Sequence, residues 1–113
     1  MDNETLEVMG KITHTYLYVL HDGEVVHRNT AAKMVAEELG IIDDSSSSEL
    51  VERAQAKLIP FLDVLLESGF LLSRPQKTVM ISPKGLEALI NHEGTFPHSF
   101  LESSIPQVLE IQL

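Results

Sequence analysis

The chain has 113 residues, of which 43% are hydrophobic, and it contains no cysteine and no tryptophan. This length supports one hydrophobic core, and the lack of cysteine excludes a disulfide framework and any cysteine-based metal or redox site. The acidic start, Met1 to Lys11, has no signal-peptide pattern and no apolar run could cross a bilayer, so we expect a cytoplasmic protein with no membrane contact. A net charge of −9 excludes a protein that coats nucleic acid by bulk electrostatics.

The charge is unevenly distributed along the chain. Residues 1–48 carry a balance of −6, residues 49–84 a balance of +1, and residues 85–113 a balance of −4. The middle segment is therefore the only one whose charge does not oppose contact with phosphates.

The N-terminal part predicts two helices joined by an extended piece. From Glu4 to Leu20 the apolar residues recur three or four positions apart, which indicates an amphipathic helix that ends before Gly23. Glu24 to His27 is predicted to be extended and to pair with a later hairpin. Asn29 or Thr30 then caps a second helix over Ala31–Leu39, which Gly40 ends.

A polar loop, Ile41 to Ser48, separates this helix from the next apolar face. Ser46 and Glu49 have the spacing of a capping box, so a helix is expected to begin there. Pro60 interrupts the apolar face that continues to Leu66. Either one helix is kinked at Pro60, or a short helix ends near Lys57 and a new one begins with Pro60 in its first turn; we favour the second arrangement.

The segment from Leu62 to Leu89 predicts a helix, a hairpin and a second helix. Ser68-Gly69 can end the first helix, and Phe70–Leu72 is short enough for a strand. Arg74 to Lys77 suits a turn, with its tip at Pro75-Gln76, and Thr78–Ile81 returns as the second strand. Ser82-Pro83 is a helix start, because Ser can cap and Pro loses no hydrogen bond at the first helical position. This last helix is expected to end by Gly94.

The periodic segments define one expected core and a C-terminal extension. Residues 1–94 are expected to form the domain, and the apolar tail 95–113 to pack on it or on a second copy of the chain, because eight large apolar side chains would otherwise face water. The inward positions are Leu17, Leu20, Val35, Leu39, Leu62, Leu65, Leu66, Leu71, Ile81, Leu86 and Leu89.

The order helix, helix, loop, helix, hairpin, helix is typical of an α+β winged helix-turn-helix domain, in which the hairpin is the wing. From about Tyr18 to Ile90 the chain resembles the N-terminal winged-helix domain of Mrr-type restriction proteins. The resemblance rests on Asp22-Gly23-Glu24, on Ser68-Gly69-Phe70-Leu71 and on Ile81-Ser82-Pro83-Lys84-Gly85. It implies a DNA-binding type of module; nothing in the sequence resembles the nuclease domain of those proteins.

Six residues are candidate contacts to duplex DNA. Cations on the third helix, the wing and the start of the last helix would contact phosphates, and Gln76 or Gln55 would reach a base edge. The candidates are Arg53, Lys57, Arg74, Gln76, Lys77 and Lys84.

We predict neither a metal or other cofactor nor an enzymatic activity. His14, His21, Asp22 and His27 lack the spacing of a zinc motif. No nucleophile elbow and no phosphate-binding glycine loop is present.

Two functions remain from these patterns. The first is a DNA-binding regulator of transcription, acting as a homodimer paired through the first helix and the tail. The alternative is an acidic protein-interaction module, such as a winged-helix adaptor or a phage-type inhibitor of a host nucleic-acid enzyme.

Overall fold

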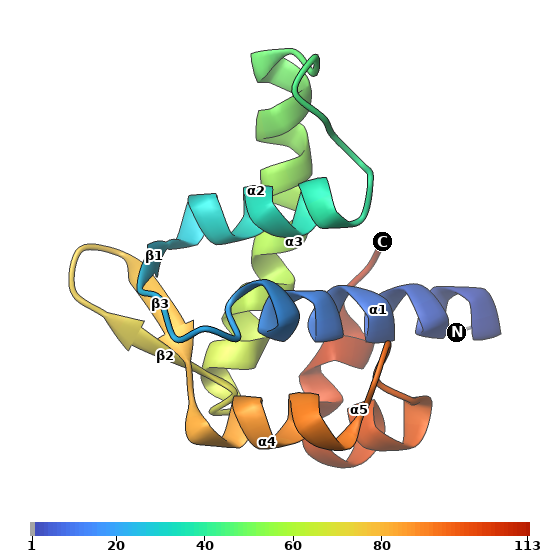
Figure 1. The fold of residues 1–113 in the computed structure, drawn as a ribbon. Coiled ribbons are helices and arrows are strands. Elements are labelled where there is room, and N and C mark those ends of the chain that lie inside the picture. Colours follow the sequence, from blue (N-terminus) through green and yellow to red (C-terminus); the bar gives the residue numbers. More distant parts are fainter. Residues whose placement is uncertain (1) are drawn as a thin grey trace.

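The computed structural model describes residues 2–113, which form a mixed α+β fold of five α-helices, a short 3-10 helix and one three-stranded antiparallel sheet (Figure 1). The elements are α1 Asn3–Val19, β1 Val26–His27, α2 Arg28–Glu38, α3 Ser48–Glu67, β2 Leu71–Arg74, β3 Thr78–Ile81, α4 Pro83–Asn91, α5 His98–Ser104 and η1 Pro106–Glu110. No helix among these residues is both long and apolar enough to cross a membrane.

Helix α1 lies at the centre of the fold. Its N-terminus is capped by Asp2, whose side chain accepts a hydrogen bond of 2.7 Å from the Thr5 N–H. The helix packs against α2, α3, α4 and α5, with α2 above it and α4 and α5 below it in the view of Figure 1. Tyr16 is fully buried and its hydroxyl donates to the Leu58 carbonyl at 2.6 Å, which ties α1 to α3. Burial raises the pKa of the Tyr16 hydroxyl, which therefore stays a donor.

The sheet confirms the predicted hairpin and the predicted extended piece. Strand β3 is central: it pairs with β2 from Leu71↔Ile81 to Arg74↔Thr78, and β1 joins its other edge through Val26↔Val79. Ser82 caps α4 by accepting from the Gly85 N–H, with Pro83 at the first helical position, as the sequence predicted.

Two predicted helix starts are wrong by a residue or more. Helix α2 begins at Arg28, and its cap is His27, whose Nδ1 accepts from the Asn29 N–H at 3.1 Å, so neither Asn29 nor Thr30 caps it. Strand β1 pairs with β3 as far as His27, so α2 begins at the next residue. Helix α3 is capped by Ser47, because the Ser46 hydroxyl instead accepts from the Asp43 N–H within the preceding loop.

The favoured break at Pro60 is also wrong, since α3 is one helix of 20 residues with Pro60 inside it. Proline cannot donate to the carbonyl of Ala56, four residues earlier. Ala56 and Pro60 are both exposed, so water can satisfy this carbonyl, while Leu58 and Phe61 continue the buried face on either side. Burial along that face outweighs the lost hydrogen bond.

The C-terminal segment packs on the same chain. Helix α5 and η1 contact α1 and α3, and four of the eight large apolar side chains of this segment are buried. These four are Phe96, Leu101, Ile105 and Val108, whereas Leu113 is 61% exposed. The apolar surface on which a homodimer was predicted is thereby largely covered within one chain, so dimerisation stays a prediction without that support.

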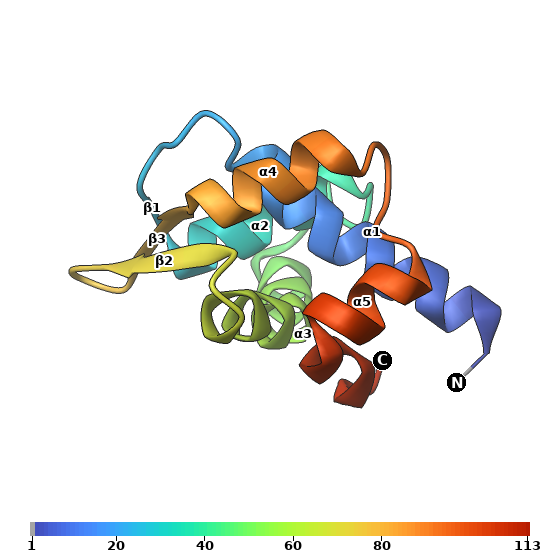
Figure 2. The ribbon, with the colours of Figure 1, turned by 90° about the horizontal axis from the view of Figure 1, so that it is seen from below.

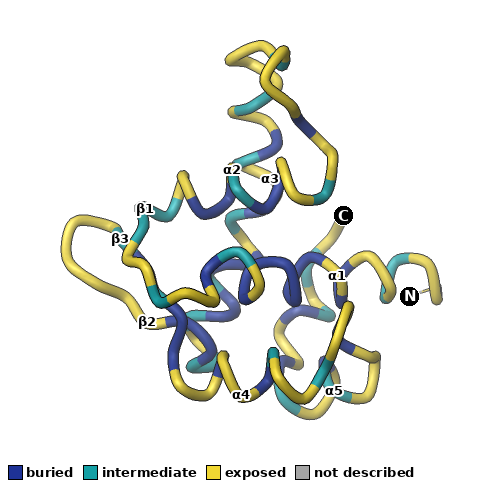
Figure 3. The backbone as a smooth tube through the Cα atoms, in the orientation of Figure 1, coloured by how far each residue is buried: buried dark blue, intermediate teal, exposed yellow. Residues whose placement is uncertain are grey.

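The core is continuous, and most of its predicted members are buried or pack against it. Leu86 is the exception, because it is 40% exposed on the outer side of α4. Figure 3 shows that the N-terminal end of α3, the loop before it and the hairpin tip are largely exposed. These are the parts that protrude from the core.

Candidate nucleic-acid interface

The hairpin tip presents three of the six candidate residues together. Arg74, Gln76 and Lys77 are exposed, and the hairpin projects from the body of the molecule in both views (Figures 1 and 2). The Thr78 hydroxyl donates to the Pro75 carbonyl at 2.7 Å, and the Arg28 N–H donates to the Lys77 carbonyl at 2.9 Å. Hydrogen bonds to two of its backbone carbonyls therefore hold the tip in shape, while the side chains of Arg74, Gln76 and Lys77 face solvent.

The backbone of this tip is left-handed at two residues that are not glycine. Gln76 has φ 63° and Lys77 has φ 59°. Such residues cost about 1 kcal/mol each in this region, a cost that the turn and the pairing of β2 with β3 must offset. The backbone conformation thus sets the direction of the Cα–Cβ bonds of Gln76 and Lys77 at the end of the hairpin.

Helix α3 supplies its candidates in a different place. Arg53 makes an ion pair of 2.8 Å with Glu49 on the same helix, and both side chains are more than 70% exposed. Lys57 is exposed one turn later. At 3.6 residues per turn, Lys57 lies about 120° around the helix from Asp63, and it is Asp63 that faces the hairpin side, through an ion pair of 2.8 Å with Arg28.

The structure therefore does not bring all of the candidates to one surface. The side of α3 nearest the hairpin base carries Asp63 and Gln55, and the Gln55 amide already donates to the Asn29 carbonyl at 2.9 Å. Arg53 and Lys57 belong to the neighbouring face of α3. A ligand that contacts both groups must span the hairpin tip and the outer face of α3.

Lys84 has a structural role. Its Nζ donates to the Ser68 carbonyl at 2.8 Å and lies 4.5 Å from the centre of the Phe70 ring. A cation on an unpaired carbonyl at the end of α3 stabilises that helix terminus, and the ring adds a cation–π contact. Among the six candidates, it is the Lys84 ammonium group that contacts both a backbone carbonyl, that of Ser68, and an aromatic ring, that of Phe70.

Sequence reasoning missed Arg28. This residue starts α2, touches the hairpin through its backbone N–H, and balances the Asp63 carboxylate through its side chain. The signal was available, because Arg28 directly follows the short extended piece predicted to pair with the hairpin. Arg28 connects α2, α3 and the hairpin in one place.

The histidines considered as metal ligands each contact nearby backbone. His14 Nε2 lies 2.8 Å from the His92 carbonyl, His21 Nδ1 lies 2.6 Å from the Tyr18 carbonyl, and His27 caps α2. Within residues 2–113 no three His, Cys, Asp or Glu side chains gather where they could hold a metal ion.

Comparison of the chain with family models, with curated proteins and with solved structures gives no match. The resemblance to Mrr-type domains therefore rests on the sequence motifs alone.

Proposed function

We propose that this chain is a winged-helix protein, a small regulator that binds duplex DNA through the hairpin as its wing. The order of elements and the sheet order β1-β3-β2 support the fold assignment. The observation that carries the function is the hairpin tip, where Arg74, Gln76 and Lys77 project from the body with their side chains in solvent.

In this proposal the two wing cations contact phosphates, while the Gln76 amide reaches a base edge. Arg28 neutralises Asp63 beside the wing, which removes a carboxylate charge that would repel the backbone of the duplex. Arg53 and Lys57, on the outer face of α3, contact phosphates further along the duplex. A site with so few cations binds weakly without base contacts, and its salt slope is shallow, because each phosphate contact contributes only about −0.9 to that slope.

A salt titration of binding to random duplex DNA tests this function. Arg74→Ala and Lys77→Ala each weaken binding to all sequences to a similar extent and each reduce the salt slope by about one. Lys11→Ala is the matched control, because it removes one exposed lysine from α1. No binding at low salt, or an unchanged salt slope in the double wing variant, refutes DNA binding by the wing.

The charge of α3 favours a second candidate, a protein-interaction module. This helix carries Glu49, Glu52, Asp63 and Glu67 against Arg53 and Lys57. A recognition helix with twice as many acids as bases suits a cationic protein surface better than a phosphate backbone. Wild-type protein that fails to bind DNA at low salt supports this candidate over the first.

A further inference from the structure

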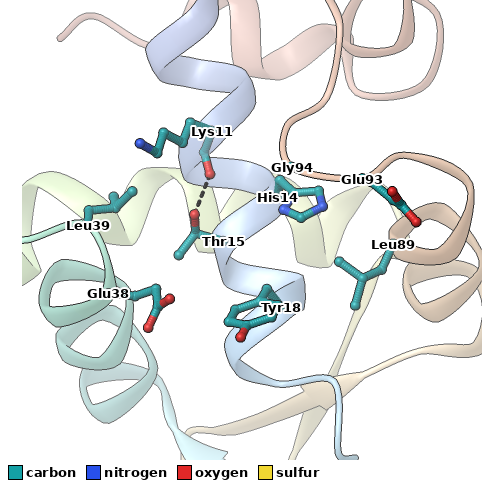
Figure 4. Close-up of a pocket in the computed structure, with 9 residues that line it drawn as sticks. All are labelled: Lys11, His14, Thr15, Tyr18, Glu38, Leu39, Leu89, Glu93 and Gly94. Carbon is teal, nitrogen blue, oxygen red and sulfur yellow. Dashed lines mark hydrogen bonds between the residues drawn. The ribbon is translucent and has the colours of Figure 1, made fainter.

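A groove of about 550 Å³ lies between α1, the C-terminal end of α2 and the C-terminal end of α4 (Figure 4). Lys11, His14, Thr15 and Tyr18 of α1 lie along it. From Lys11 to Tyr18 the rise of an α-helix gives about 10 Å, so the groove follows two turns of α1. It involves neither the hairpin nor α3.

The floor of this groove has no unsatisfied polar group to offer a ligand. The Thr15 hydroxyl donates to the Lys11 carbonyl at 2.6 Å, and His14 Nε2 lies 2.8 Å from the His92 carbonyl. No buried side-chain nitrogen or oxygen among residues 2–113 lacks a hydrogen-bond partner. A small polar metabolite would therefore find little to recognise here.

The surface that the groove does offer is apolar. Tyr18 is 49% exposed, and Leu39 and Leu89 face it from α2 and α4 (Figure 4). Leu86, which lies one turn before Leu89 on α4, is 40% exposed. Exposed apolar side chains that gather at a groove mark interaction surfaces in soluble proteins.

The charges at the rim select the kind of partner. Glu38 at the end of α2 and Glu93 after α4 stand on opposite sides of the groove, and Lys11 is the one cation among its lining residues (Figure 4). Burial, more than any other influence, lowers the pKa of His14, so the imidazole adds no positive charge at neutral pH. A second copy of the chain, itself at −9, would meet electrostatic repulsion.

We propose that this groove binds an amphipathic helix of a cationic protein partner. Apolar residues spaced three or four apart on that helix pack on Tyr18, Leu39 and Leu89, the spacing by which helices fill grooves. Lysine or arginine residues flanking this stripe reach Glu38 on one side and Glu93 on the other. The helix body stays outside the groove, because a helix with its side chains is about 10–12 Å wide and only its apolar stripe enters.

Selection from a displayed peptide library tests the proposal. The peptides have about 14 residues, the length at which isolated helices become marginally stable, and all positions are randomised. We expect the selected peptides to share an apolar i, i+3/i+4, i+7 pattern with net positive charge. Their affinity falls at least about tenfold for Tyr18→Ser and for Glu38→Lys.

Two matched variants on α3 keep the test specific. Leu50→Ser removes an apolar side chain with 44% exposure, close to that of Tyr18, and Glu67→Lys reverses an exposed acid. Both should bind the selected peptides like wild type. Replacing lysine by glutamate in a peptide should restore its binding to Glu38→Lys.

Several outcomes overturn the proposal. They are the recovery of no peptide, of acidic or neutral peptides, or of peptides whose affinity the α3 variants reduce instead. Sedimentation that shows a dimer lost in Tyr18→Ser also overturns it, since the occupant would then be a second copy. The DNA titration is a separate measurement, so either proposal can fail alone.

Discussion

Replacing Gly10 by alanine tests whether the C-terminal segment is docked on α1 as the structure shows. A Cβ added at Gly10 would lie 2.1 Å from the backbone oxygen of Phe96, where real Cβ atoms keep at least 3.0 Å. The two backbones are also joined there by a hydrogen bond of 3.3 Å from the Phe96 N–H to the Gly10 carbonyl. The clash is with backbone, so no side-chain rotation relieves it.

Two opposing effects set the magnitude. Alanine is a better helix former than glycine by about 0.5–1 kcal/mol, which alone would stabilise α1. Against this, α1 and the segment around Phe96 must separate by roughly 1 Å or more at a packed site. Such overpacking of a core costs about 1–3 kcal/mol. Phe96, only 2% exposed, loses its fit against α1. We expect a net loss of up to about 2.5 kcal/mol, which lowers Tm by up to about 10 °C, at about 4 °C per kcal/mol for this size.

Thermal unfolding followed by circular dichroism measures this effect. Glu7→Ala is the control, because it makes an exposed change in the same helix. Protease cleavage after Gly94 should also become faster in Gly10→Ala, since the segment is bared. A Tm that rises in Gly10→Ala would show that helix propensity acts alone and that the segment does not sit on α1.

Three further changes have expected outcomes. Pro60→Ala should raise the free energy of unfolding by about 1–2 kcal/mol, because the Ala56 carbonyl regains its partner; urea unfolding measures it, and destabilisation would mean that the helix is broken there after all. Leu65→Ala should cost about 2–5 kcal/mol, since Leu65 is fully buried, and an unchanged Tm would show that the face is misassigned. Burial lowers the pKa of His14 from 6.5, so its contribution to stability is present above pH 6.5 and is lost as pH falls below it. His14→Gln should flatten this part of the pH–stability curve, as measured by urea unfolding at several pH values.

The local parts of the fold were predictable because their signals lie within a few residues. Ser82-Pro83 starts α4, and Gly69 with φ 82° ends α3, as capping chemistry requires. The hairpin follows from two β-prone runs around a turn. Each of these features is decided by neighbours in the chain.

The errors arise where distant residues decide. Pro60 stays inside α3 because Leu58 and Phe61 pack on partners from other elements, which the local sequence does not show. His27 caps α2 because β3, some fifty residues later, fixes its backbone. Leu86 shares the spacing of core residues, yet it is left 40% exposed on α4.

The candidate interface also contains some features that the local sequence predicts and others that distant contacts decide. The hairpin residues Arg74, Gln76 and Lys77 are exposed together, as the pattern indicated. That Lys84 is held by the Ser68 carbonyl, and that Asp63 is matched by Arg28, depends on contacts 16 and 35 residues apart in the sequence. Such pairings cannot be read from spacing along one helix.

The pairing of Val26 with Val79 has a consequence for how the chain reaches this fold. Helices and the hairpin need only short-range contacts, whereas this pairing closes a loop of about fifty residues, at an entropic cost that grows with loop length. We therefore expect the hairpin and helices to form early and β1 to join β3 late. In refolding experiments with pulsed hydrogen exchange, the amides that link β2 to β3 should gain protection before those that link β1 to β3. The segment that follows α1 would then pair with the hairpin in the last step of folding.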